Sequence, residues 1–270
     1  MQKVKAILCD FDGTLVNWEK KYSKNTKNLI GQIQKKGIRF SLATGRIYYG
    51  VIEKVVKELG IDGIHIIHGG AMIYDSLLDK KYWYQPISKT SIDVISDYLI
   101  KRKIIFAYET ERSIYMSPKV IGTSYLKNAE LLDIKEYKKE DVMKLLIFAS
   151  ANGFSELQID GHIKQMQKLV KDVEILKSSF NGYFGIDMTS QYSTKHTAVL
   201  EYCKILGLSS SEIVAIGDGH NDYPLFTASG FKIAMGNAYP ELKEIADLVV
   251  ETSDNGGIEE ALNFILKKLT

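Results

Sequence analysis

Val4-Lys5-Ala6-Ile7-Leu8-Cys9-Asp10-Phe11-Asp12-Gly13-Thr14, close to the start of a chain of 270 residues, is the stretch of sequence that decides the fold. Its first six residues form a nearly continuous apolar run, which is typical of a strand buried on both faces of a parallel sheet. Two acidic residues, Asp10 and Asp12, follow that run beside Gly13. The stretch therefore predicts a buried strand that carries carboxylates to one edge of a sheet.

The segments that follow alternate between helical and strand patterns. Gly37 and Gly60 end two segments with helical spacing, 25–36 and 48–59, as glycines commonly do at helix C-termini. This rhythm predicts an α/β fold with a doubly wound, Rossmann-like parallel sheet as its core. The predicted core strands are 4–9, 38–43, 63–67, 212–217, 231–235 and 248–251, and later helices begin near residues 197, 240 and 257.

The middle of the chain follows a different pattern. A short hairpin is expected over 72–84, and from about residue 86 strands come in pairs with helices between them. Such a pattern is typical of an α+β module. We therefore expect a core made of residues 1–84 and 188–270, with an inserted α+β domain over residues 85–187.

Composition excludes several classes of protein. The chain has 35 Lys and Arg against 33 Asp and Glu, a net charge of +2, and no basic run that would suit a nucleic acid. No apolar run approaches the roughly 18–20 residues that span a bilayer, and the start of the sequence lacks a signal-peptide pattern. The two cysteines, Cys9 and Cys203, provide no disulfide framework. We expect a cytoplasmic protein, monomeric or homodimeric, without nucleic-acid or membrane partners.

Three polar residues directly follow predicted buried strands, namely Asp10, Thr44 and Asp218. Because the carboxyl ends of parallel strands share one edge of the sheet, we expect these side chains to converge on one crevice. Asp12 and Asp222 lie close to them in sequence, so four carboxylates meet there. Their mutual repulsion requires a cation, and Mg²⁺ suits a set of hard oxygen ligands.

Other residues near these carboxylates suit a phosphate group. Thr44 offers a hydroxyl, and the backbone around Gly13 and Gly45 offers N–H donors. Lys195, which precedes a predicted helix, offers a positive charge. A metal ion, a lysine, a hydroxyl and loop amides together predict a phosphate-binding site.

The motifs resemble those of the haloacid dehalogenase superfamily of phosphohydrolases. Asp10–Leu15, Ser41–Arg46 and Gly217–Asp222 are similar to its first, second and fourth motifs, and Lys195 stands where its third motif has a lysine. The stretches 234–238 and 252–258 are similar to the Cof-type subfamily. That subfamily carries a large α/β cap between its second and third motifs, which is the place of the inserted domain here.

The resemblance implies a two-step reaction. Asp10 would attack phosphorus and form an aspartyl-phosphate. Asp12 would protonate the leaving alcohol and then deprotonate the attacking water. Dehalogenases of the superfamily lack an acid two residues after the nucleophile, so Asp12 favours phosphoesters, whose leaving alkoxide needs a proton.

The resemblance also implies the binding roles. Asp222 would orient Lys195 or a metal-bound water, and Arg46 would either have a structural role or contact the substrate. The inserted domain would close over the crevice and select the leaving group. The implied metal site is Asp10, Asp12 through its carbonyl, Asp218 and Asp222; the implied phosphate or substrate site is Thr44, Gly45, Arg46, Lys195 and Asn221.

We therefore expect a Mg²⁺-dependent phosphatase of small phosphorylated metabolites such as sugar phosphates. A phosphotransferase or mutase with the same nucleophile, and a sugar-phosphate-binding regulator without turnover, are the alternatives. The sequence departs from the family at two places. His196 replaces the glycine that usually follows the third-motif lysine, and Gly69-Gly70-Ala71 stands where relatives often have Asn-Gly-Ala.

Overall fold

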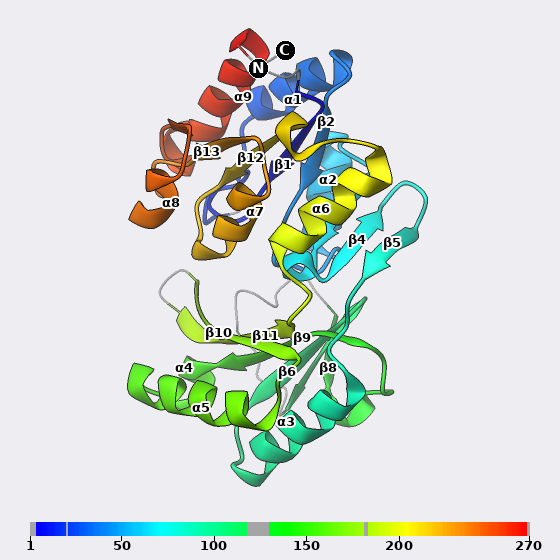
Figure 1. The fold of residues 1–270 in the computed structure, drawn as a ribbon, viewed down its shortest axis with the longest axis vertical. Helices are drawn as coiled ribbons and strands as arrows, with labels where there is room; N and C mark the ends of the chain where they lie inside the picture. Colours follow the sequence, from blue (N-terminus) through cyan, green and yellow to red (C-terminus); the bar gives the residue numbers. More distant parts are fainter. Residues whose placement is uncertain (1–3, 20, 118–129, 181–182, 269–270) are drawn as a thin grey trace. The chain divides into compact units, whose positions relative to one another are not determined.

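The structure, a computed structural model, describes residues 4–19, 21–117, 130–180 and 183–268. These residues form two compact units (Figure 1). Unit 1 contains the described residues of Met1–Arg46, Lys54–Trp83 and Thr194–Thr270. Unit 2 contains those of Ile47–Glu53 and Tyr84–Ser193. The short segment directly after Arg46 therefore packs with the inserted part of the chain.

A parallel sheet of five strands, in the order β14-β13-β12-β1-β2, forms the centre of unit 1 (Figure 1). β1 lies between β12 and β2, pairs in parallel with both, and buries all four of its residues. This arrangement confirms the predicted α/β class with a parallel core sheet. The strands are β1 Ala6–Cys9, β2 Arg39–Leu42, β12 Ile213–Gly217, β13 Phe231–Ala234 and β14 Leu248–Val249.

Helices cover this sheet. Ala198, Val199 and Tyr202 of α6 pack into one apolar cluster with strand residues such as Leu8 and Ala215. The hydroxyl of the fully buried Tyr202 forms a hydrogen bond of 2.8 Å with Ser41, so its polar atom is satisfied. The helices are α1 Lys24–Lys35, α2 Val51–Leu59, α6 Lys195–Leu206, α7 Tyr223–Thr227, α8 Pro240–Glu244 and α9 Gly257–Lys268.

The predicted third strand, β3 Ile64–Ile67, joins the core sheet at a single point rather than along a ladder. Ala43 and Ile66 form an isolated parallel bridge, and the N–H of Thr44 donates to the Ile66 carbonyl at 2.9 Å. β3 then pairs antiparallel with β4 Met72–Asp75, and β5 Lys80–Tyr84 completes a three-stranded sheet. The hairpin expected over 72–84 is confirmed.

Unit 2 contains a six-stranded sheet in the order β10-β11-β9-β6-β7-β8. Its pairs are antiparallel except β7 with β8, and helices α3 and α5 pack on it through a large apolar cluster. The inserted part of the chain therefore has the α+β architecture that was expected. Its elements are α3 Lys89–Lys101, β6 Phe106–Thr110, β7 Ser113–Ser117, β8 Glu130–Asp133, β9 Val142–Phe148, α4 Ala149–Asn152, α5 Glu156–Leu169, β10 Val173–Phe180 and β11 Tyr183–Ser190.

Among the described residues, every helix is too short or too polar to cross a membrane.

Candidate active site

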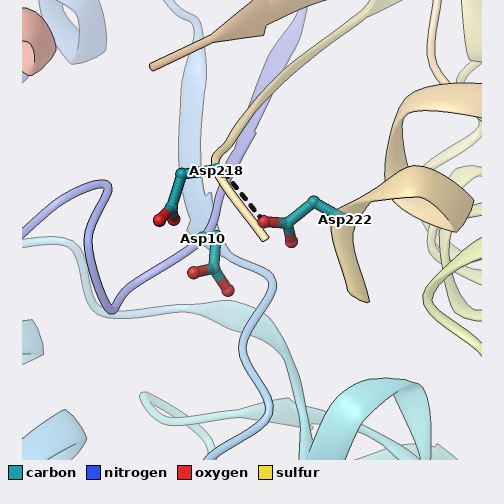
Figure 2. Close-up of side chains that lie close together, drawn as sticks. All are labelled: Asp10, Asp218 and Asp222. Atoms are coloured by element: carbon teal, nitrogen blue, oxygen red, sulfur yellow. Dashed lines mark hydrogen bonds between the residues drawn. The ribbon is translucent and has the colours of Figure 1, made fainter. Parts of the chain in front are cut away.

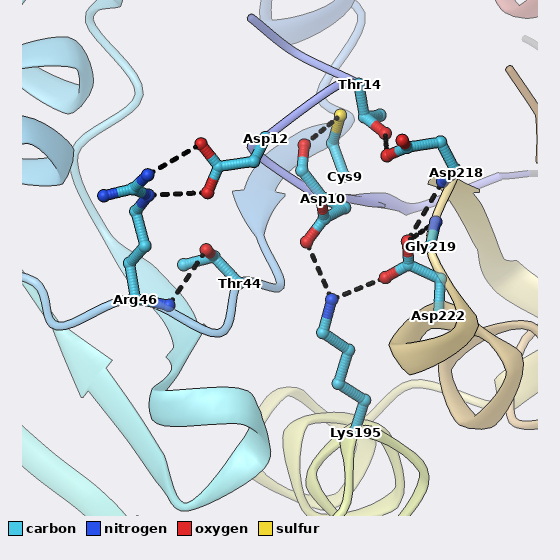
Figure 3. A network of polar contacts seen from close by, with 10 residues as sticks. All are labelled: Cys9, Asp10, Asp12, Thr14, Thr44, Arg46, Lys195, Asp218, Gly219 and Asp222. Atoms are coloured by element: carbon cyan, nitrogen blue, oxygen red, sulfur yellow. Dashed lines mark hydrogen bonds and ion pairs between the residues drawn. The ribbon is translucent and has the colours of Figure 1, made fainter. Parts of the chain in front are cut away.

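The carboxyl edge of the core sheet brings together residues that are far apart in sequence. Asp10 follows β1, and its N–H donates to the Ile216 carbonyl of β12 at 2.8 Å. Asp218 follows β12, and Thr44 follows β2 after one residue. Figure 3 shows these side chains within one polar network, to which α6 contributes Lys195. The convergence expected from strand order is therefore present in the structure.

Three of the carboxylates form a compact, buried cluster (Figure 2). One oxygen from each of Asp10, Asp218 and Asp222 lies within 4.8 Å of the others, and the residues are 5%, 6% and 0% exposed. Burial, followed by the charge of Asp222, raises the pKa of Asp10 to about 7. Burial, followed by the charge of Asp10, raises the pKa of Asp218 to about 8. Such raised values record the cost of placing like charges together away from water.

A divalent cation fits this cluster. Carboxylate oxygens are its preferred ligands, and its charge would offset both the burial and the mutual repulsion that raise the two pKa values. Asp222 has a further role, because its Oδ2 accepts hydrogen bonds from the N–H groups of Asp218 and Gly219 at 3.0 and 2.9 Å. These bonds fix the loop that carries Asp218.

Lys195 connects two members of the cluster. Its Nζ lies 2.7 Å from Oδ1 of Asp10 and 2.5 Å from Oδ1 of Asp222, and its side chain is 1% exposed. Burial alone would lower the pKa of Lys195, but the carboxylates of Asp10 and Asp222 outweigh it and raise the pKa above its ordinary value. The side chain therefore stays charged and holds the orientation of Asp10.

The local sequence explains how Lys195 reaches this position. Thr194 is the N-cap of α6, and its hydroxyl accepts the Thr197 N–H at 3.0 Å, so Lys195 stands in the first helical turn. Gly70 packs against this turn with φ +106°. A Cβ on Gly70 would lie 2.5 Å from the carbonyl carbon of Thr194. Only glycine permits this approach.

The preceding residue, Gly69, also has a left-handed backbone conformation, but without a steric constraint. Gly69 has φ +71°, and a Cβ there would meet nothing within 4 Å. Glycine and asparagine are the residues that most readily adopt this left-handed conformation. The replacement of Asn by Gly at position 69 therefore keeps the backbone, whereas position 70 has a steric requirement for glycine.

The loop after β2 is held on both sides. The hydroxyl oxygen of Thr44, which is 1% exposed, accepts the N–H of Arg46 at 3.2 Å, and the Thr44 carbonyl accepts the N–H of Gly69 at 2.9 Å. Because the Thr44 oxygen is the acceptor, its hydrogen can be donated to a ligand. A Cβ on Gly45 would have no atom within 4 Å, so the backbone of this residue borders open space.

Asp12 and Arg46 form a two-point ion pair. Nε of Arg46 lies 2.5 Å from Oδ2 of Asp12, and Nη2 lies 3.0 Å from Oδ1. The Arg46 side chain is 6% exposed and that of Asp12 is 13% exposed. The carboxylate of Asp12 is thus bound by Arg46, while the acidic cluster in Figure 2 consists of the other three aspartates.

Asp218 has two partners to which the sequence analysis gave no role. The hydroxyl of Thr14 donates to its Oδ1 at 2.6 Å, and the amide of Asn237 donates to its Oδ2 at 3.0 Å. Asn237 also donates to the Gly13 carbonyl at 3.0 Å and accepts the N–H of Ser253 at 2.9 Å. Asn237 lies three residues after the end of β13, so a strand-end rule that extended to the following loop could also have selected it.

Two residues of the fourth motif lie beside the cluster. Asn221 is exposed on the short 3-10 turn His220–Asp222, consistent with a side chain that can meet a ligand. The ring of His220 packs against that of Tyr239, with 3.7 Å between the ring centroids and 31° between the ring planes.

Comparisons with known proteins identify the family of the chain. A family model described as haloacid dehalogenase-like hydrolase matches residues 7–262. The phosphatase YwpJ of Bacillus subtilis is 27% identical, over 97% of this chain and 100% of that protein. The phosphoglycolate phosphatase of Archaeoglobus fulgidus is 30% identical, over 98% of both chains.

Solved structures share the fold. A haloacid dehalogenase-like hydrolase from Bacteroides thetaiotaomicron superposes with a TM-score of 0.85 at 23% identity, over 97% of this chain and 100% of that one. The subclass IIB sugar phosphatase BT4131 superposes with a TM-score of 0.81 at 21% identity, over 97% and 99% of the two chains. Both match across the parallel core and the inserted sheet.

Proposed function

The chain belongs to the haloacid dehalogenase-like hydrolases, Cof-type, and is a hydrolase of phosphoric monoesters; on that premise we propose that it is a Mg²⁺-dependent phosphatase that works through an aspartyl-phosphate. One observation carries the proposal. The buried carboxylate of Asp10 is held 2.7 Å from Lys195, and two further carboxylates have oxygens within 4.8 Å. This arrangement supports the assignment of Asp10 as nucleophile beside a set of metal ligands.

Asp10, Asp218 and the carbonyl of Asp12 would hold the metal, and Asp222 would stabilise the loop and Lys195. Thr14 and Asn237 support this assignment, because their hydrogen bonds fix both oxygens of Asp218. When bound, Mg²⁺ supplies positive charge that offsets the negative charge of the phosphoryl group and of Asp10.

Asp10 would be the nucleophile. Lys195 holds Oδ1 of its carboxylate and so restricts where the group lies relative to an incoming phosphorus atom. A positioned nucleophile raises the rate because the entropy cost of orientation is already met by the fold. The Asp10–phosphorus bond forms as the ester P–O bond breaks, and the electron pair of that bond stays on the leaving oxygen.

The phosphoryl oxygens would be bound by the Thr44 hydroxyl, the backbone at Gly45, Lys195 and Asn221. The Thr44 hydroxyl is already fixed by the Arg46 N–H, and Lys195 is a permanent cation. Donors that need no rearrangement stabilise the charge that develops in the transition state.

Asp12 would move the protons. As the ester bond breaks, a proton passes from the Asp12 carboxyl to the leaving oxygen and gives the free alcohol. In the second step Asp12 takes a proton from water as the water oxygen attacks phosphorus. The Asp10–phosphorus bond then breaks, which restores the Asp10 carboxylate and releases inorganic phosphate.

We propose small phosphorylated metabolites, sugar phosphates or similar monoesters, as substrates. Phosphoglycolate phosphatase is among the relatives and a sugar phosphatase shares the fold, so closely similar cores serve different leaving alcohols. The inserted domain, residues 85–187, is accordingly proposed to select the alcohol.

Cys9 and Cys203 are buried free thiols, which supports a cytoplasmic location.

Phosphate release from a panel of phosphate esters, with and without Mg²⁺, tests the proposal. Asp10→Asn keeps the shape of the side chain and removes the nucleophile, so we expect kcat to fall by on the order of 10⁴-fold or more. A cooperative thermal unfolding transition and a wild-type circular dichroism spectrum of the variant would show that its fold is intact. Substantial turnover by Asp10→Asn, or by the metal-free wild type, would sink the proposal.

A further inference from the structure

Arg46 and Asp12 form a bidentate ion pair, in which the guanidinium contacts both carboxylate oxygens (Figure 3). Two donors on one rigid guanidinium contact two different oxygens, at 2.5 and 3.0 Å. A side-chain carboxylate held at one point can still rotate, but one held at two points has a fixed plane. Arg46 therefore determines the direction in which the Asp12 carboxylate faces.

The backbone of Arg46 is itself fixed. Its N–H donates to the Thr44 hydroxyl at 3.2 Å, and its carbonyl accepts the His68 N–H at 3.0 Å. The residue is 5% exposed, and its guanidinium carbon lies 6.0 Å from the centre of the Phe11 ring. Arg46 and Thr44 therefore lie on the same loop and are joined by a hydrogen bond. The position of the guanidinium group is thus fixed relative to Thr44, the proposed phosphate ligand.

We propose that Arg46 is a positioning residue that orients Asp12 for proton transfer, in place of a direct contact with the transferred phosphoryl group. The inference rests on the proposed function, because it concerns the acid and base of that reaction. Arginine suits this task and lysine does not, since an ammonium group offers one point of attachment without a fixed plane.

The role has a chemical signature. When the ester P–O bond breaks, an alkoxide leaving group must receive the proton from Asp12, whereas p-nitrophenolate is stable as an anion and leaves without it. A misdirected Asp12 therefore slows the first step, release of the leaving group, with alkyl phosphates and spares that step with p-nitrophenyl phosphate, whereas the second step, in which Asp12 is the base, is slowed equally for both. A contact between Arg46 and the phosphoryl group would affect both esters alike, because they share that group.

The experiment measures the single-turnover rate of leaving-group release, with enzyme in excess, for wild type, Arg46→Ala, Arg46→Lys and Asp12→Ala on a sugar phosphate and on p-nitrophenyl phosphate. Arg39→Ala is the matched control, because Arg39 is an exposed arginine at the start of β2 and its loss changes the net charge equally. The inhibition constant of inorganic phosphate is measured for each variant.

We expect Arg46→Ala to lower the single-turnover rate on the sugar phosphate by about 10²-fold, within the range of general acid–base contributions, and to leave the single-turnover release of p-nitrophenolate near the wild-type rate. Arg46→Lys should show the same selectivity, and it preserves the charge if the alanine variant folds poorly. The double variant with Asp12→Ala should be no slower than Asp12→Ala alone, because the two residues act as a unit.

Equal losses in the single-turnover rate on the two esters, or weaker inhibition by inorganic phosphate in Arg46→Ala, would show a phosphoryl contact and overturn the inference. Full activity of Arg46→Lys would also overturn it. These outcomes differ from failure of the proposed function itself, in which wild type releases no phosphate or Asp12→Ala shows no dependence on the leaving group.

Discussion

The ammonium nitrogen of Lys195 lies 2.5 Å from Oδ1 of Asp222, and the two side chains are 1% and 0% exposed. Removal of one member of a buried pair leaves the other charge without a partner, which typically costs about 3–5 kcal/mol. For Lys195→Met at pH 8 we expect a loss of stability of that size, together with loss of turnover. Urea unfolding followed by circular dichroism measures it.

The double variant Lys195→Met with Asp222→Asn is the control for this prediction. Because it removes both charges, we expect it to recover part of the stability and none of the activity. If Lys195→Met alone unfolds at the wild-type urea concentration, the pair does not contribute to stability as the structure indicates.

Metal-free protein should lose stability as the pH rises. The pKa of Asp10 is raised to about 7 and that of Asp218 to about 8 in the folded state, against 3.8 when unfolded. A raised folded pKa gives stability that is present below the unfolded pKa and is lost as the pH passes through the folded values. In EDTA, wild type should therefore lose stability between about pH 4 and 8 relative to Asp218→Asn. The same change of Tm with pH in the two proteins over this range would contradict the prediction.

Magnesium should reverse that loss at high pH. Ligand at 100 times its Kd stabilises a folded protein by about 2.7 kcal/mol. We expect an upward shift of Tm with Mg²⁺ at pH 8, a much smaller shift at pH 5, and almost none in Asp218→Asn. A shift of equal size in wild type and Asp218→Asn would place the ion elsewhere.

Thr14 and Asn237 should tune metal affinity without a direct contact to the ion. Each holds one oxygen of Asp218, at 2.6 and 3.0 Å. Loss of such partners typically lowers metal affinity or activity about 10–100-fold. We expect Thr14→Val and Asn237→Ala to raise the Mg²⁺ concentration for half-maximal activity by that factor. Thr14→Ser keeps the hydroxyl and should behave like wild type; a defect as large as that of Thr14→Val would point to packing instead.

Gly70→Ala should be more harmful than other glycine substitutions. Its Cβ would lie 2.5 Å from backbone atoms of Thr194, and φ is +106°, so we expect a cost of about 2 kcal/mol or more and a lower kcat, because Lys195 would shift. Gly37→Ala, with φ +80° and nothing within 4 Å, should cost only about 1 kcal/mol and keep full activity. Thermal unfolding and phosphate release compare the two.

Gly69 provides a second contrast. Its φ of +71° suits asparagine, and a side chain there has free space. Gly69→Asn should therefore be more stable than Gly69→Ala. The opposite order would mean that the backbone conformation does not govern this position.

The sequence predicted the sheet and the convergence of Asp10, Thr44 and Asp218 because these depend on strand order alone. A buried apolar run identifies a parallel strand, and the carboxyl ends of parallel strands must meet. Local signals of that kind also gave the α+β character of the inserted part, where paired strands and helices alternate.

Features that depend on side-chain geometry or distant contacts were beyond the sequence. The ion pair between Arg46 and Asp12 depends on the rotamers of the two side chains, which the sequence does not specify. The sequence therefore left the role of Arg46 open. The strand β8 has acidic residues at both ends, Glu130 and Asp133, so it lacks the continuous apolar run that identified β1. The packing of Ile47–Glu53 with unit 2 depends on tertiary contacts that no local signal records.

The bond between Thr14 and Asp218 joins residues that are 204 positions apart, and β1 is flanked by β12. A ribosome therefore releases the strand of Asp10 first but must finish the whole inserted unit before the partner strand exists. At about 5–20 residues per second that interval lasts roughly 10–40 s. Asp10 thus gains the carboxylates of Asp218 and Asp222 only after β12 has been made, and a nascent chain interrupted before β12 carries Asp10 without them.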